Sequence, residues 1–400
     1  MALMVVLWSA PASATGSAAA TATSERLDCA EAIRLLAQQD PPLPAVQRAV
    51  DRACAEEDAV SDSDTGDAVD RWQQDYRAAV ARRARTLAAS QDPLHLLASA
   101  LIVPFPGTRE APSPDAWTAQ DAGAAFAAAV RLGRDDSLIA WIEALDCPWP
   151  VAHATCHPEA AMQRLHRSEP DNAAVWLLAH SRADEDSIEA GRLLDAAANS
   201  TRYRLAFGDI GALMHEQYAA VESPQMQPEV AQALAEDYGQ AAGTVPDVAG
   251  IQAMATAAAV ALPEFSSLRR ACVPPDGARI TPDRHEACTA IYTLMSEDPL
   301  LITQRVALVS LVGLSAGSPE GQGWRERLRQ LHWIVTNAQV VLARATPPGY
   351  TRAVWRDGEL PALKALLAGA GIPAVPAADW LPEDSRTREL IRTGRETQEN

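Results

Sequence analysis

Residues 169–200 read EPDNAAVWLLAHSRADEDSIEAGRLLDAAANS, and this stretch shows how the chain is built. Apolar residues recur at helical spacing in its first half and again in its second half. A short polar segment, Ser181 to Asp186, separates the two runs. The pattern therefore predicts two helices joined by a turn, which together form a helical hairpin.

Similar patterns fill most of the remaining chain. Helices are expected at 67–90, 94–103, 119–134, 136–145, 158–169, 203–221, 227–242, 246–263, 282–296, 298–314 and 321–344. Asp67 is the expected N-cap of the first of these helices. Alternation of apolar and polar residues between turns, which is typical of strands, is not evident. The sequence predicts an all-α fold of antiparallel helical hairpins stacked as an irregular array.

Changes in composition divide the chain into six expected segments. These are a signal peptide (1–14), a flexible Ala/Thr/Ser linker (15–26), an N-terminal helical region (27–103), a second helical region (119–242), a C-terminal helical region (246–345) and a Pro-punctuated tail with short helices (346–400). The 400 residues exceed what one small core usually organises, so several units or an extended array are expected.

The charge of the chain limits the classes of ligand that it is expected to bind. The formal net charge is −18, which disfavours nucleic acid and anionic lipid as ligands because both require a basic surface. A basic protein partner suits this charge better. Lys364 is the single lysine, so the chain contains no Walker A motif, and a Schiff-base lysine could only be Lys364.

The first residues have the features of a secretory signal. Residues 2–8 are apolar, and Ala12-Ser13-Ala14 matches the small-residue cleavage pattern. No later run reaches the 18 apolar residues expected of a membrane-spanning helix. We therefore expect export to an oxidising space, the bacterial periplasm or the extracellular medium, with no membrane span after cleavage.

Six cysteines predict three local disulfide bridges. The expected pairs are Cys29–Cys54, Cys147–Cys156 and Cys272–Cys288. The midpoint of the first pair falls on the Pro41-Pro42 turn of a predicted hairpin, where residues equidistant from the turn lie side by side. The other two pairs each enclose a proline-containing loop. Free thiols would fit poorly with export.

The second of these loops, CPWPVAHATCH at residues 147–157, also resembles a haem or metal site. A c-type haem site requires Cys-x-x-Cys-His, whereas His153 replaces the first of the two cysteines here. Zinc could use His153, Cys156 and His157, but no second ligand cluster accompanies them. A structural bridge is the preferred interpretation, and we expect neither cofactor nor metal.

A weak internal repeat suggests a family. The run from Asp136 to Trp141 recurs from Asp171 to Trp176, with an offset of 35 residues between the tryptophans. Around the second copy, Ala174, Leu177, Ala190, Leu194 and Ala197 stand where a tetratricopeptide (TPR) repeat has similar residues, so residues 136–203 resemble one to two TPR-like units. Trp176, Leu178 and Ser181 depart from that pattern. The resemblance implies stacked helical hairpins with a protein-binding surface.

Three further patterns are weaker. Gly313 to Gly317 matches the G-x-S-x-G elbow around Ser315, but a helical pattern precedes it where the elbow requires a strand. Residues 61–73 resemble a calcium loop but lack its terminal Glu. His215-Glu216 and His285-Glu286 each begin an H-E-x-x-H motif without the second His, and helix surface is the simpler interpretation.

These observations favour an exported helical-repeat protein that acts as a protein-interaction module, adaptor or acidic inhibitor, with no assigned catalytic residue. Two alternatives stay open: a serine-type hydrolase using Ser315, and a haem- or metal-binding protein using His153 and His157.

The export hypothesis can be tested directly. We expect the mature protein to begin at or near Thr15, because signal peptidases cleave after small residues such as Ala12 and Ala14. Amino-terminal sequencing of the protein purified from its natural host measures this. Retention of Met1 in a cytoplasmic fraction would contradict export.

Overall fold

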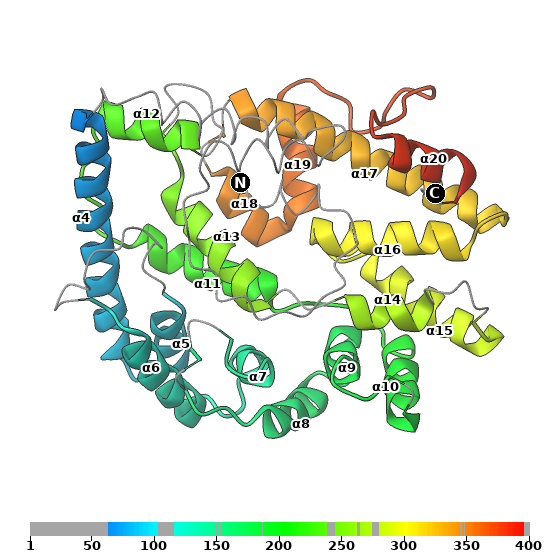
Figure 1. Ribbon diagram of the computed structural model, residues 1–400, viewed down its shortest axis with the longest axis horizontal. Coiled ribbons are helices and arrows are strands. Elements are labelled where there is room, and N and C mark those ends of the chain that lie inside the picture. The colour runs from blue at the N-terminus through cyan, green and yellow to red at the C-terminus, as the bar shows by residue number, and fades with distance from the viewer. Residues whose placement is uncertain are drawn as a thin grey trace, which may run out of the picture. The chain divides into compact units, whose positions relative to one another are not determined.

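Every regular element in the described part of the chain is a helix. The computed structural model (Figure 1) describes residues 63–102, 116–148, 151–152, 154–185, 187–237, 245–261, 265–273, 280–344, 346–347 and 349–395. Within these ranges no strand occurs, and one isolated parallel bridge joins Asn172 to Arg202. The prediction of an all-α fold is confirmed.

Local sequence explains where many helices begin. Pro occupies the first helical position of α5 (Pro93–Leu101), α8 (Pro158–Ser168) and α15 (Pro282–Met295), where its missing N–H is not needed. Thr118 and Asp121 form a reciprocal capping box at α6 (Ala119–Leu132). Such caps satisfy backbone N–H groups that have no partner inside the helix.

The first described helix starts earlier than the sequence predicts. α4 (Ser63–Ala88) already contains Asp67, whose carbonyl accepts a hydrogen bond from Arg71 Nε at 3.1 Å. Asp67 is therefore not the N-cap, and residues 63–73 form no calcium loop. The physical reason is cooperativity. Once a long helix is held by buried residues such as Trp72 and Tyr76, adding another turn costs little free energy.

The chain divides into two compact units. The first contains residues up to Asp75 together with Pro224–Pro246 and includes α12 (Pro228–Asp237). Within it, Trp72 Nε1 donates a hydrogen bond to the carbonyl of Pro224 at 3.3 Å. The second unit contains Tyr76–Ser223 and Asp247–Asn400. Both units are discontinuous, whereas the segments expected from composition are continuous, and those expected boundaries stay predictions.

Successive helices of the second unit pack in pairs. α5 packs on α6, α7 (Ser137–Ala144) on α8, α9 (Ala173–His180) on α10 (Ile188–Ala198), and α16 (Leu301–Leu314) on α17 (Pro319–Arg344) (Figure 1). The remaining elements are α11 (Phe207–Ala219), α13 (Val248–Ala261), α14 (Ser266–Cys272), α18 (Tyr350–Asp357), α19 (Glu359–Gly369) and α20 (Ser385–Thr393). The segment expected as a tail thus supplies three packed helices.

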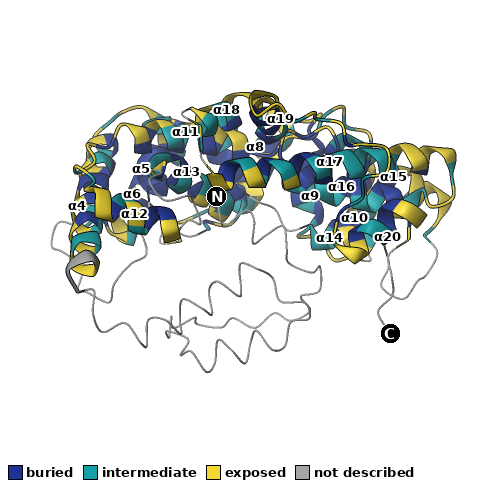
Figure 2. Cartoon of the chain, turned by 90° about the horizontal axis from the view of Figure 1, so that it is seen from above, coloured by how far each residue is buried: buried dark blue, intermediate teal, exposed yellow. Residues whose placement is uncertain are grey.

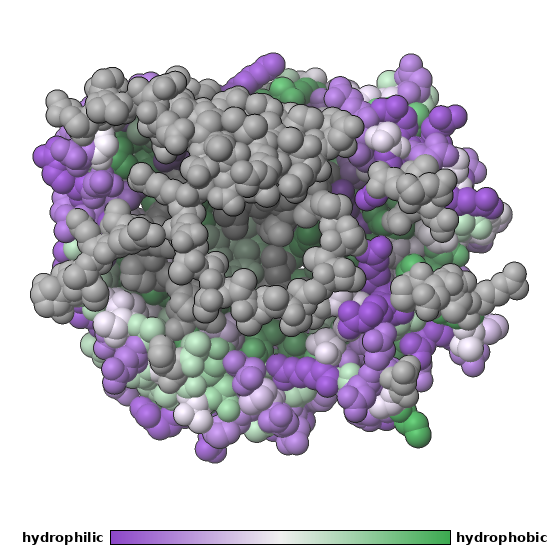
Figure 3. All heavy atoms as spheres, in the orientation of Figure 1, coloured by the Kyte–Doolittle hydropathy of each residue, from purple (hydrophilic) through white to green (hydrophobic). Residues whose placement is uncertain are grey.

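Many of the helices, among them α4, α6 and α8, are amphipathic, as the periodicity predicts. Figure 2 shows buried and exposed residues on the same helices. Figure 3 shows hydrophilic residues along much of the visible outer rim of the described part. Among the described residues, no single helix is long and apolar enough to cross a membrane, although the bent pair α13 and α14 passes that test together by length and composition.

Two of the three expected bridges are present. Cys147–Cys156 and Cys272–Cys288 have Cα–Cα distances of 5.8 Å and 5.7 Å. The second joins the last residue of α14 to a residue inside α15. Cys29 and Cys54 lie outside the described residues, so their pairing stays a prediction. Disulfide bridges are typical of proteins in an oxidising environment.

A close contact connects the starts of α16 and α19. Gly358 has φ +92° and ψ 163°, a backbone conformation that is essentially restricted to glycine. A β-carbon at Gly358 would clash with the Pro299 side chain. The next residue, Glu359, donates its backbone N–H to the Pro299 carbonyl at 3.1 Å. This junction requires glycine for two independent reasons.

The requirement for glycine at this junction can be tested by mutation. We expect Gly358→Ala to lower the free energy of unfolding by roughly 2–4 kcal/mol, because it adds both backbone strain and a clash. Gly349→Ala is the control for left-handed strain alone: Gly349 has φ +80° and ψ 0° with open space around it, so about 1 kcal/mol is expected. Urea denaturation measures both. Equal losses would contradict a special requirement for glycine at position 358.

Candidate functional site

The loop that resembles a haem or zinc site is tied to the fold by structural interactions. Cys156 is bridged to Cys147, so it is not available as a zinc thiolate. His157 is the N-cap residue of α8, and its backbone N–H donates to Glu143 Oε1 at 3.0 Å. Glu143 is 1% exposed and also forms an ion pair with Arg164. His153 lies outside the described residues.

The G-x-S-x-G match lies at the end of a helix. Ser315 is the C-cap residue of α16, so no strand precedes it and the elbow geometry is absent. His332 lies 13 residues beyond the start of α17, which corresponds to about 20 Å of helix. Burial, followed by the charge of Arg305, lowers the pKa of His332 to about 4. The structure does not bring Ser315 and His332 together as a catalytic pair.

The two incomplete metal motifs are on helix surfaces. His215 lies in α11 and His285 in α15, and the glutamate after each is exposed. His285 Nε2 contacts the carbonyl of Leu314 at 3.1 Å. Within the described ranges, no group of three His, Cys, Asp or Glu side chains is placed to hold a metal ion.

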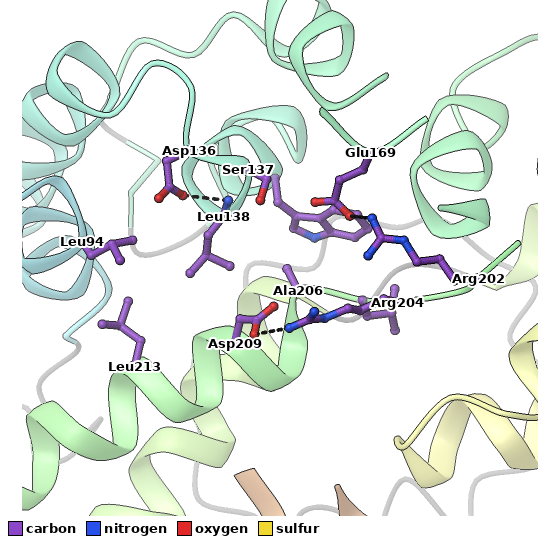
Figure 4. Close-up of a pocket in the computed structure, with 12 residues that line it drawn as sticks. Leu94, Asp136, Ser137, Leu138, Glu169, Arg202, Arg204, Ala206, Asp209 and Leu213 are labelled. Atoms are coloured by element: carbon purple, nitrogen blue, oxygen red, sulfur yellow. Dashed lines mark hydrogen bonds and ion pairs between the residues drawn. The ribbon is translucent and has the colours of Figure 1, made fainter. Parts of the chain in front are cut away.

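A cleft that the sequence did not predict lies in the second unit. It has a volume of about 500 Å³ (Figure 4). Its lining comes from α5, α7 with its N-cap residue, the C-cap residue of α8, the segment 202–206 and α11: Leu94, Asp136, Ser137, Leu138, Trp141, Glu169, Arg202, Arg204, Leu205, Ala206, Asp209 and Leu213. Figure 4 shows three leucines, Leu94, Leu138 and Leu213, toward one end, with Glu169 and Arg202 toward the other.

The segment carrying the two cleft arginines is held by α9. Asn172, the N-cap residue of α9, accepts a hydrogen bond from Arg204 N and donates one to Arg204 O, both at 2.9 Å. Ala173 N donates to Arg202 O at 2.8 Å. The backbone from Arg202 to Arg204 is therefore held along the first turn of α9. The backbone that carries both arginine side chains is thus fixed in position.

The cleft charges are mostly paired. Arg202 contacts Glu169 at 3.4 Å and Asp171 at 3.3 Å, and Arg204 contacts Asp209 at 2.5 Å. Asp136 accepts hydrogen bonds from the backbone N–H groups of Leu138 and Ile139, which caps α7. The lining thus holds two arginines and three carboxylates, which leaves it net negative.

Trp141 contributes an unsatisfied hydrogen-bond donor. The side chain lines the cleft and is 3% exposed, yet Nε1 has no hydrogen-bond partner. Buried polar groups are almost always paired in native proteins, so an unpaired indole N–H calls for an explanation. In the sequence, Trp141 stands out as part of the internal repeat, and its place beside the cleft comes from the tertiary structure.

A smaller cavity of about 220 Å³, the acid cavity, lies in the same unit. Its lining is Arg204, Leu205, Phe207, Gly208, Asp209, Asp298, Pro299, Leu300, Val354, Trp355, Arg356, Asp357, Gly358 and Glu359. Asp298 and Glu359 are 3% and 7% exposed. Asp298 Oδ1 accepts from Leu300 N, and Glu359 Oε2 accepts from Leu301 N, each at 2.8 Å.

Burial makes both carboxyl groups weak acids. Loss of solvent raises the pKa of Asp298 to about 7, against the lowering effect of the Leu300 N–H. Burial likewise raises the pKa of Glu359 to about 7, with the charge of Asp298 adding to it. Both groups therefore change protonation state near neutral pH, and pKa values perturbed in this way cluster at functional sites.

These raised pKa values predict a pH dependence of stability. Because the folded pKa lies above the unfolded value near 4, the folded state holds extra protons, and stability falls as pH rises from about 4 to 7. The free energy of unfolding of Glu359→Gln, relative to that of the wild type, should rise by about 2–3 kcal/mol between pH 5 and pH 8. Gln can still accept from Leu301 N, so the helix cap is retained.

Urea denaturation at each pH measures this difference. His332 has a lowered pKa and affects stability in the opposite sense. Its contribution to the free energy of unfolding is lost as pH falls from 6.5 to about 4. It is present in both proteins and cancels in the comparison. A difference that stays constant with pH would show that Glu359 is not a weak acid in the folded state.

Comparison with known proteins assigns the chain to no family: no family model, curated protein or solved structure matches it. The tetratricopeptide resemblance therefore has no independent support from relatives. The cleft and the acid cavity, built from residues spread over more than 250 positions between Leu94 and Glu359, are the features from which a function can be argued.

Proposed function

We propose that this chain is an exported, helical-hairpin protein that binds a segment of another protein in the cleft. The observation that carries the proposal is the composition of the cleft. Half-buried leucines lie beside fixed charges in a cleft with a volume of about 500 Å³. Binding sites in proteins commonly combine apolar contact area with a few oriented polar groups. The leucines supply the contact area, and the held arginines and carboxylates supply orientation.

The pairing of helices supports the proposal of a TPR-like arrangement in this region. α7 packs on α8 and α9 packs on α10, so residues 137–198 form two consecutive hairpins. The two tryptophans of the repeat differ in register: Trp141 lies five residues after its cap Asp136, and Trp176 lies four after its cap Asn172. One residue rotates a side chain by about 100° around a helix. This accounts for Trp141 lining the cleft while Trp176 stacks on His166 at 4.1 Å.

The periplasm is the compartment we propose. Two disulfide bridges fit an oxidising environment, and the expected signal peptide would direct export to one. The net charge of −18 and the negative cleft lining favour a basic partner. An adaptor or an acidic inhibitor of a basic exported protein would both have these properties.

Affinity capture with cleft variants tests this function. Wild-type protein, immobilised, should retain one or a few partners from an extract of exported proteins of the natural host. Leu138→Arg and Leu213→Arg place a charge on the apolar end of the cleft and should reduce retention at least tenfold, because a buried unpaired charge is costly. Mass spectrometry with isotope labelling quantifies the loss.

The matched control is Ile188→Arg. Ile188 is 95% exposed on α10 and lines neither cavity, so the same chemical change there should leave retention unaltered. Circular dichroism establishes that all three variants fold. Equal retention by the cleft variants and the control would show that partners bind elsewhere, and retention of nothing by wild-type protein would contradict the binding function.

A further inference from the structure

The cleft and the acid cavity adjoin one another. Arg204, Leu205 and Asp209 line both of them. The Arg204–Asp209 ion pair at 2.5 Å is thus a shared wall between the two spaces. Arg204 is half exposed, with 55% of its side chain accessible, so the pair lies at the surface where a ligand can reach past it.

The acid cavity has an excess of negative charge. Among its charged residues, Arg204 pairs with Asp209, and Arg356 pairs with Asp357 at 2.5 Å. The two remaining groups, Asp298 and Glu359, line this space and belong to none of the described ion pairs. Burial raises the pKa of Asp298, although the Thr303 side chain and the Arg204 charge both act to lower it. Both are more than nine-tenths buried. A buried carboxylate without a partner is unfavourable by several kcal/mol.

Helix capping alone does not explain this pair. Each carboxyl group uses one oxygen to accept a backbone N–H at the start of α16. Asn or Ser would cap the same N–H groups without placing an ionisable group in a low-dielectric site. The second feature that needs explaining is independent of the acids: the buried Nε1 of Trp141 has no hydrogen-bond partner, and Trp141 is one of the residues that line the adjoining cleft.

One ligand satisfies both features. A cationic side chain in the acid cavity would neutralise Asp298 and Glu359, and the ring of Trp355, which also lines that cavity, can interact with a cation through its π face. A main-chain carbonyl in the cleft would accept the hydrogen bond that Trp141 Nε1 lacks. A peptide carries both groups at a fixed spacing.

We propose that the two spaces form one peptide-binding groove, in which the acid cavity receives a lysine or arginine side chain and the cleft holds the adjoining backbone and an apolar neighbour. This inference rests on the proposed protein-binding function and specifies its ligand. The partner segment is a basic residue flanked by apolar ones. The negative charge of the whole chain would attract such a segment from a distance.

Two capped tripeptides test the assignment on the full-length oxidised protein. Acetyl-Leu-Arg-Leu-amide should bind at least about tenfold more tightly than acetyl-Leu-Met-Leu-amide by calorimetry at pH 8, where both carboxyl groups are ionised. Agmatine, a guanidinium probe without a peptide backbone, should compete with the arginine peptide. Trp141→Phe removes the indole N–H and should weaken both peptides by about fivefold to the same extent.

The double variant Asp298→Asn/Glu359→Gln removes the charge and keeps both helix caps. It should abolish the preference for the arginine peptide, whereas Asp195→Asn, an exposed acid on α10 outside both cavities, should preserve that preference. If the double variant fails to fold, two measurements test the assignment instead: the preference of Glu359→Gln for the arginine peptide, and the affinities of the wild-type protein for the two peptides. Equal affinity of wild-type protein for both peptides, no binding of either, or an undiminished preference in the folded variant would overturn the assignment.

The outcomes separate this inference from the proposed function. Loss of partner capture in Leu138→Arg together with equal affinity for both tripeptides would leave the cleft as a protein-binding site and reject the acid cavity as its basic-residue pocket. A preference for the arginine peptide without capture of any protein would support the groove and reject the proposed biological role.

Discussion

The side-chain amide of Asn172 is the constraint on which the groove depends. It is 1% exposed, so each of its polar atoms must find a partner inside the protein. Its oxygen accepts from Ala174 N and Arg204 N, and its nitrogen donates to Glu169 and to Arg204 O. This satisfies the full capacity of the amide.

Two of those four hydrogen bonds, both to the backbone of Arg204, connect the start of α9 to the segment that precedes α11. Arg204 lies in both cavities, and Glu169 lines the cleft, so one buried amide positions groups on both sides of the groove. Asp at this position could accept the two N–H groups but could not donate to Arg204 O. A buried charge would also replace a neutral group, which explains why an amide suits the site.

The other side of the groove is built by close approach of helices. Trp355 of α18 packs against Gly211 of α11, where any β-carbon would clash with its ring. Gly358 then turns the chain against Pro299 and directs Glu359 to the first turn of α16. The segment that looks like a tail in the sequence therefore supplies one wall of the acid cavity and one of its two buried acids.

Local patterns determined the helices and the bridges. The 3.6-residue period places most helices within a few residues of their observed bounds, because burial of one face is a local property of the sequence. The loops around Cys147–Cys156 and Cys272–Cys288 were evident because their prolines exclude helix between nearby cysteines. The start of α4 was missed, since cooperative extension from buried residues outweighs the cap preference of Asp67.

The candidate site was decided by tertiary structure alone. The sequence drew attention to Ser315, His153 and His157 because they lie in short recognisable patterns, whereas Arg204, Asp298 and Glu359 lie in none. Asp298 and Glu359 are 61 residues apart, and each resembles an ordinary surface acid or helix cap in its own segment. Their burial, their raised pKa values and their place beside Arg204 come from contacts between α11, α16, α18 and α19. Local periodicity contains no information on such contacts, because it records which face of a helix is buried and not which helix covers it.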